Sequence, residues 1–250
     1  MNLEKAKEEF LNYTENYDLE NHNLKRKQLH SLRVMEISKL IAKKIGLSQE
    51  EIELAAVIGL LHDIGRFEQF TQHNTYKDLN SLDHGDLGAN ILQKDIRKYV
   101  ETEEYDEIII KAIKNHNKYE IEKGLTDKEE LFAKIVRDAD KIDIFYESVE
   151  FFWKGNEYQV EQSIISENII EQFENFSQVK NNIHETEIDD IVKIIAFIFD
   201  INFKASFEIL KENDYINKIL NRYKIKDEYT KEKIEEIRKI ANVYIEQRVE

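Results

Sequence analysis

The chain has 250 residues and a formal net charge of −15, and its lack of cysteine excludes disulfides, thiolate metal sites and cysteine nucleophiles. Such an acidic surface lacks the basic stripe that a nucleic-acid polymer needs, although a small anion can bind where a cation reverses the local field. Proline is absent, where average usage predicts roughly 12 residues, and only 7 glycines occur. Few residues therefore break helices, and we predict an all-α protein.

The first third of the chain predicts three helices followed by a long loop. Apolar periodicity indicates helices over 3–15, 24–45 and 48–65. The second should end at Gly46, and the third opens with the capping-box pattern SQEE from Ser48 to Glu51. The segment RFEQFTQHNTYKDLNS, residues 66–81, lacks helical periodicity. We predict a loop there, and loops of this length in compact domains are often functional.

The remaining pattern is also helical. Helices are predicted over 82–93, 103–116 and 126–153, the last opening with a second capping box, TDKE. The last hundred residues predict three or four amphipathic helices. We expect one domain over residues 1–250, with residues 151–250 as an extension packed on the core. A homodimer interface is the alternative use of these C-terminal helices.

No segment predicts a signal peptide or a membrane span. The N-terminal sequence MNLEKAKEEF is charged and has no apolar stretch. The most apolar later run, residues 191–203, contains Lys193 and Asp200 and is too short to cross a bilayer. We therefore expect a cytoplasmic protein without a membrane partner.

Four histidines and two aspartates lie on helix faces that otherwise carry apolar residues. Their spacing to these apolar neighbours directs each of them inward. The six residues are His30, His62, Asp63, His84, His116 and Asp140. A core hydrogen bond or an ordinary ion pair would explain any one of them, but convergence on a cation explains all six. A cation also provides the partner that a buried carboxylate requires. The other histidines, His22, His73 and His184, lie in polar stretches.

Three of the segments around these residues resemble one family. HSLRV begins at His30, LLHDIGRF contains His62 and Asp63, and RDADKID contains Asp140. Together they resemble the HD superfamily of metal-dependent phosphohydrolases, whose signature H…HD…D lies on an all-α core. The wider pattern GRFEQF…Y…D…S-DH…G is similar to a bacterial subgroup with mostly undefined substrates. The resemblance covers about residues 24–150, which would form the catalytic core.

The resemblance implies a metal site. A first divalent ion would be bound by the signature residues His30, His62, Asp63 and Asp140. Asp140, rather than Asp138, aligns with the terminal aspartate of the family. His84 and His116 match the two extra histidines of HD proteins with binuclear sites, in which Asp63 would bridge two ions; a mononuclear site is the alternative. Such ligands suit Mn, Fe, Co, Ni, Zn or Mg.

The reaction that this implies is hydrolysis of a nucleotide or another small phosphate ester by a metal-bound hydroxide. Asp63 would position the metals, and Arg66, at the mouth of the site, would act with it and bind phosphate. Lys141 is a second candidate for phosphate binding, and Arg33 is a weaker one. The expected partner is a small phosphorylated substrate rather than a nucleic-acid polymer.

Neighbouring polar residues have predicted supporting roles. The loop residues His73, Tyr76 and Lys77 could form a lid or supply a general acid. Three aspartates could orient the ligand histidines. These are Asp83, Asp138 and Asp143.

Two other functions use the same residues. A di-iron HD enzyme would carry out oxygen-dependent chemistry, and a non-catalytic sensor would bind a nucleotide for regulation. Two branches of the superfamily are disfavoured. The cyclic-dinucleotide phosphodiesterases have a Gly-Tyr-Pro element that is absent after His116. Guanosine-tetraphosphate hydrolases use a mononuclear site and lack equivalents of His84 and His116.

Overall fold

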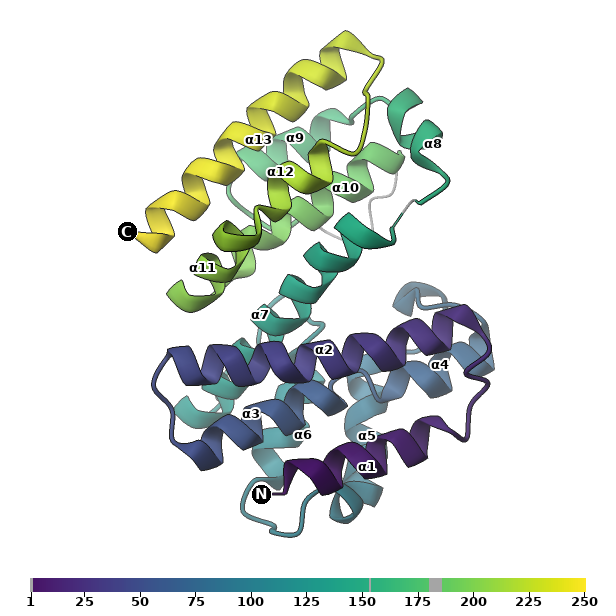
Figure 1. Cartoon of the computed structure of the whole chain (residues 1–250), viewed down its shortest axis with the longest axis vertical. Helices are drawn as coiled ribbons and strands as arrows, with labels where there is room; N and C mark the ends of the chain where they lie inside the picture. Colours follow the sequence, from purple (N-terminus) through teal and green to yellow (C-terminus); the bar gives the residue numbers. More distant parts are fainter. Residues whose placement is uncertain (1, 153, 180–185) are drawn as a thin grey trace. The chain divides into compact units, whose positions relative to one another are not determined.

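The computed structural model describes residues 2–152, 154–179 and 186–250. These residues form helices and contain no strand, which confirms the predicted all-α fold (Figure 1). None of the described helices combines the length and apolar character that a membrane span requires. The chain divides into two compact units, Met1–Asp140 and Lys141–Glu250. The single domain with its C-terminal extension packed on the core stays a prediction.

The first unit contains six α-helices and the beginning of a seventh within its described residues. They are α1 (Leu3–Thr14), α2 (His22–Lys44), α3 (Gln49–Leu61), α4 (Gly65–His73), the 3-10 turn η1 (Asp78–Asn80), α5 (His84–Tyr99), α6 (Asp106–Asn115) and α7 (Asp127–Glu150), which continues into the second unit. Both predicted capping boxes are present, at Ser48 with Glu51 and at Thr126 with Glu129. Gly46 follows α2 with a φ of 82°, as a C-terminal glycine should.

Helix α3 is the centre of this unit. Every residue from Leu54 to Leu61 is buried, because α1, α2 and α6 pack around the helix. Gly59 allows α2 to approach closely: a Cβ there would lie 2.5 Å from the Ser38 Oγ and 2.8 Å from the Val34 carbonyl oxygen. The side-by-side packing of α2 and α3 is visible in Figure 1. It brings His30 of α2 next to the residues that follow α3.

The predicted loop over 66–81 is wrong for its first half, because α4 covers residues 65–73. Two aromatic side chains bury one face of this short helix. The Phe67 ring lies 6.0 Å from that of Phe10, and the Phe70 ring lies 4.8 Å from that of Tyr76. Two apolar positions are too few for a clear period in the sequence, so tertiary contacts stabilise this helix. Residues 74–83, which include η1, remain a loop.

The second unit contains shorter helices than predicted. After α7 the described residues form α8 (Glu157–Gln162), α9 (Glu167–Glu174), α10 (Glu187–Ile195), the 3-10 turn η2 (Ala196–Asp200), α11 (Lys204–Asn213), α12 (Tyr215–Leu220) and α13 (Glu228–Val249). The prediction of three or four helices is therefore wrong. Asp214, with a φ of 52°, separates α11 from α12 without the glycine or proline that marks a break in the sequence. The predicted helix end at Trp153 and the position of His184 lie outside the described residues.

Candidate metal centre

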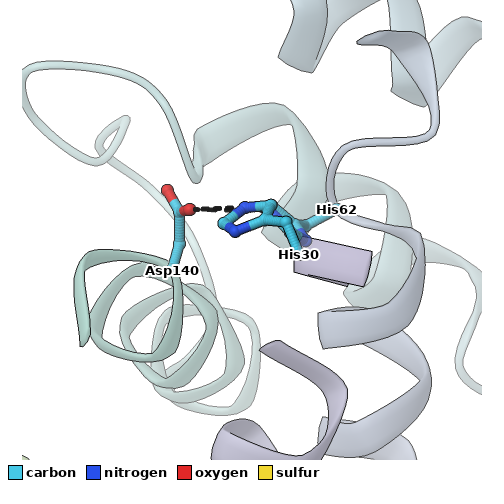
Figure 2. Close-up of side chains that lie close together, drawn as sticks. All are labelled: His30, His62 and Asp140. Carbon is cyan, nitrogen blue, oxygen red and sulfur yellow. Dashed lines mark hydrogen bonds and ion pairs between the residues drawn. The ribbon is translucent and has the colours of Figure 1, made fainter. Parts of the chain in front are cut away.

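The six predicted residues meet inside the first unit, although they come from five separate parts of it. His30 lies within α2, and His62 and Asp63 form the turn after α3. His84 is the first residue of α5, and His116 directly follows α6. Asp140 lies on α7 and points toward His30 and His62 (Figure 2). All but Asp140 are buried, and the Asp140 side chain is 16% exposed.

The four histidines form two pairs that meet through the same ring nitrogen. His30 and His62 have their Nε2 atoms 3.2 Å apart. The Nε2 atoms of His84 and His116 are 3.0 Å apart. Asp140 joins the first pair, because its Oδ1 lies 3.1 Å from the His30 Nε2 and 3.6 Å from that of His62.

Asp63 lies between the two pairs and presents one carboxylate oxygen to each. Its Oδ2 is 3.5 Å from the Nε2 atoms of both His30 and His62. Its Oδ1 is 3.4 Å from the Nε2 of His84 and 3.6 Å from that of His116. We call the groups around Oδ2 (His30, His62 and Asp140) the first subsite and those around Oδ1 (His84 and His116) the second subsite.

Hydrogen bonds on the far side of the rings determine which nitrogen carries the proton. The Nδ1 of His62 donates to the Gly59 carbonyl at 2.8 Å, and that of His116 donates to the Ile113 carbonyl at 2.6 Å. The Nδ1 of His84 donates to the Asp78 carboxylate at 2.7 Å. The three Nε2 atoms therefore direct lone pairs into the centre.

In the second subsite the lone pairs of two Nε2 atoms therefore face each other, and these atoms are 3.0 Å apart. Protonation of one ring would relieve their repulsion, but burial together with the Arg66 charge lowers the pKa of His84 to about 3. A cation between the nitrogens satisfies both of them. Neutral imidazoles beside a carboxylate are a donor set that divalent metals accept, so these residues fit a metal ion. Two groups of three residues, His30 with His62 and Asp140, and His62 with Asp63 and His116, have ligand atoms close enough to hold one.

Asp63 also has a cationic protein neighbour. The Lys27 Nζ lies 2.7 Å from its Oδ2. Burial raises the pKa of Asp63, but the charge of the Lys27 ammonium opposes this, and the pKa lies well below its usual value. Lys27 is absent from the sequence-based prediction, although it precedes His30 by three residues and so lies on the same face of α2.

Arg66 lies beside the centre and is anchored to the loop after α4. Its Nε is 3.6 Å from the Asp63 Oδ1. Its Nη1 donates to the Gln69 side chain at 2.6 Å, the Tyr76 carbonyl at 2.7 Å and the Asp78 carboxylate at 2.9 Å. Arg66 thus connects Asp63 to the loop, and its contact with phosphate stays a prediction.

Lys141 belongs to the second unit, where its Nζ lies 2.7 Å from the Asp200 Oδ2. The predicted role of Lys141 in phosphate binding therefore stays a prediction. Among the loop residues predicted to form a lid, His73 and Lys77 are exposed, and Tyr76 packs on Phe70.

One carboxylate that contacts a ligand histidine from outside the centre is Asp78, which the sequence-based prediction missed. Asp83, one of the three predicted aspartates, instead accepts from the backbone N–H of Asp86 at the start of α5 and pairs with Lys118. Asp138 and Asp143 are buried. Asp78 lies in a loop, where no periodicity indicates the direction of a side chain.

Arg137 is a second residue that the prediction missed. It is 1% exposed and donates to the backbone carbonyls of Asn115 at 2.8 Å and Lys118 at 2.6 Å. These bonds hold the chain on both sides of His116. Arg137 precedes Asp140 by three residues on α7, so it joins the helix of one predicted ligand to the segment of another.

The pKa values of His62 and His84 predict that the metal-free protein loses stability in mild acid. In the unfolded chain a histidine has a pKa of about 6.5, whereas burial lowers both values in the fold, that of His84 to about 3. Below about pH 6.5 the unfolded state binds more protons. The free energy of unfolding should then fall by up to about 1.4 kcal/mol per pH unit for each histidine.

Urea unfolding in the presence of a chelator, compared between pH 7 and pH 5, measures this loss. His84→Gln should show a smaller decrease over the same interval, because one of the two histidines is gone. Equal stability of the parent protein at both pH values would contradict the prediction.

Comparison with known proteins agrees with this geometry. Residues 29–144 match the family model of the HD domain. No curated protein and no solved structure shows a significant match to the chain. The matched segment begins one residue before His30 and ends after Asp140, so it contains all six residues of the centre. Over residues 29–144 the chain is therefore similar to the HD domain, whose superfamily consists in general of metal-dependent hydrolases.

Proposed function

We propose that the protein is a phosphohydrolase that uses two divalent cations to cleave a nucleotide or another small phosphate ester. One observation carries the proposal: the two oxygens of Asp63 each face a pair of imidazole Nε2 atoms at 3.4–3.6 Å. A single ion would be bound by only one of the two histidine pairs. Two ions bridged by Asp63 would satisfy both pairs.

The first ion would be held by His30, His62, Asp140 and the Oδ2 of Asp63. The second would be held by His84, His116 and the Oδ1 of Asp63. All these ligands are imidazole nitrogens or carboxylate oxygens, which suit Mn, Fe, Co, Ni, Zn or Mg. Because supply as well as ligand type selects among these metals, purification without a chelator is needed to identify the native ones.

Cations in the two subsites would polarise a phosphoryl group and lower the pKa of a nearby water molecule. The chain itself contributes fixed positions and charge. Asp63, buried in the turn after α3, presents one oxygen to each subsite. Lys27 and Arg66 lie on opposite oxygens of Asp63, and both lie over the Tyr76 ring, at 5.7 and 5.6 Å from its centroid. Their positive charges would favour a phosphate ester at the centre.

The distribution of charge favours a small substrate over a polymer. The chain as a whole carries −15, so it repels an extended polyanion, and the positive potential would be confined to the metal centre. We therefore propose a small phosphorylated compound as the partner, and neither a nucleic-acid polymer nor a membrane.

Metal analysis of protein purified without a chelator, followed by a screen of nucleotides and phosphate esters with Mn²⁺ or Co²⁺, tests the proposal. We expect about two ions per chain and phosphate release from at least one class of ester. A chelator should abolish this release, and the added metal should restore it. Metal-free protein, or a metal-loaded protein that hydrolyses no monoester, diester or nucleotide, would refute the proposal. Bound iron with oxygen consumption would support the di-iron alternative instead.

A further inference from the structure

The Asp78 carboxylate collects hydrogen bonds from three different parts of the HD domain. It accepts from the His84 Nδ1 at 2.7 and 2.9 Å, at the start of α5. From α4 it accepts the Arg66 Nη1 at 2.9 Å and the Gln69 Nε2 at 2.8 Å. From the segment after α6 it accepts the Asn117 Nδ2 at 3.2 Å. Each of these partners has an N–H group that can donate, so the Asp78 side chain is their common acceptor.

Two of these bonds lead to the histidines of the second subsite. His84 is bonded directly, and Asn117 is the residue after His116. The two histidine segments also meet at Gly85, where a Cβ would overlap the Asn117 side chain. Asp78 therefore helps to join the two chain segments that must approach each other for the His84 and His116 Nε2 atoms to meet, together with Asp83, which accepts from the same Asn117 Nδ2 at 3.0 Å.

The third bond leads to Asp63. Arg66 contacts Asp78 through Nη1 and faces the Asp63 Oδ1 through Nε. This Oδ1 is the oxygen that belongs to the second subsite, whereas Lys27 contacts the Oδ2 of the first. The contacts of Asp78 with His84, Asn117 and Arg66 thus all lead to the second subsite.

We propose that Asp78 is a positioning residue for the second subsite and controls its metal affinity without binding the metal. The inference rests on the proposed binuclear function. Asp78 accepts a hydrogen bond from the Nδ1–H of His84. This bond keeps the Nε2 lone pair directed at the metal and prevents the ring from rotating. Residues 74–83 are then part of the metal centre, although this loop supplies no ligand.

The experiment compares Asp78→Ala and Asp78→Asn with a matched control, Asp86→Asn. Asp86 lies in the first turn of α5, near His84, and its side chain is 49% exposed. Equilibrium dialysis against Mn²⁺ gives the affinity of each ion. Electron paramagnetic resonance distinguishes a coupled pair of Mn²⁺ ions from an isolated one, and thermal unfolding with a chelator checks the fold.

Asp78→Ala should weaken the second ion by about 10–100-fold, as the loss of an outer hydrogen-bond partner does, and change the first by less than about twofold. The coupled Mn²⁺ signal should give way to that of an isolated ion. Asp78→Asn keeps one acceptor oxygen and should weaken the second ion by a smaller factor. If the alanine variant does not fold, this weakening in the asparagine variant decides the question. Asp86→Asn should bind both ions like the parent protein.

Unchanged binding of both ions by Asp78→Ala would overturn the inference and leave the proposed function intact. Equal weakening of both ions would also overturn it, because the contacts of Asp78 lie on one side only. A parent protein that binds no Mn²⁺, or one ion only, would instead refute the binuclear function on which the inference rests.

Discussion

Asp63→Ala should abolish turnover and leave the protein with at most weakly bound metal. Among the described residues, Asp63 is the one that faces both histidine pairs, so its loss removes a ligand from each subsite. Loss of a single group that stabilises a transition state costs about 10²–10³-fold in rate. Since Asp63 serves two cations, we expect a loss of at least about 10³-fold. Phosphate release and metal content per chain measure the two effects.

Asp95→Ala is the matched control for this substitution. Asp95 lies on α5, its side chain is 43% exposed, and it forms a surface pair with Lys98 at 3.0 Å. Such pairs contribute little to stability, so metal content and turnover should stay at the parental level. Hydrolysis that survived Asp63→Ala and remained sensitive to a chelator would show that the reaction does not depend on the bridging carboxylate.

Gly65→Ala should destabilise the HD domain and disrupt the second subsite, although alanine is the better helix former. A Cβ at Gly65 would lie 2.5 Å from the His84 carbonyl oxygen and 2.7 Å from the Gly88 backbone nitrogen. Both atoms belong to the backbone of α5, so α4 and α5 must separate. Gly65 is two residues from Asp63, and the separation therefore moves Asp63 away from His84. Overpacking costs about 1–3 kcal/mol or more, which exceeds the gain of about 1 kcal/mol in helix propensity.

Gly88→Ala provides the comparison, because it makes the same chemical change on the facing helix. Its Cβ would lie 3.3 Å from the Ile113 Cγ2 and 3.4 Å from the Ile64 Cγ2, and both of these are side-chain atoms that can shift. We expect little change in the urea midpoint and binding of both ions. A Gly65→Ala protein as stable as Gly88→Ala, with the same metal content, would contradict the proposed role of the close approach.

The candidate metal centre shows which features of a site the sequence can predict and which it cannot. Helical periodicity correctly directed His30, His84 and Asp140 inward, because the direction of a helical side chain depends only on its position within a few residues. The other three residues of the centre lie in the turns directly after α3 and α6, and the apolar pattern of these helices indicated their burial. Periodicity did not predict the contacts that surround the centre. Asp78 lies in a loop without a period, and its partners on α4, α5 and after α6 are brought together by packing. Lys27 and Arg137 lie one turn from predicted ligands, but their spacing does not distinguish an ion pair from an exposed charge.

By itself the sequence determined the helical class, the two capping boxes, the approximate bounds of α1 and α2, and which residues of the centre are buried. These follow from interactions between residues close in the chain. Only the tertiary structure decided that α4 is a helix, that the second unit is built from short helices, and that the two oxygens of Asp63 face different histidine pairs. Each of these features depends on which helix surfaces pack together. The local sequence of a helix does not predict its packing partner, as the close contacts at Gly59 and Gly65 show.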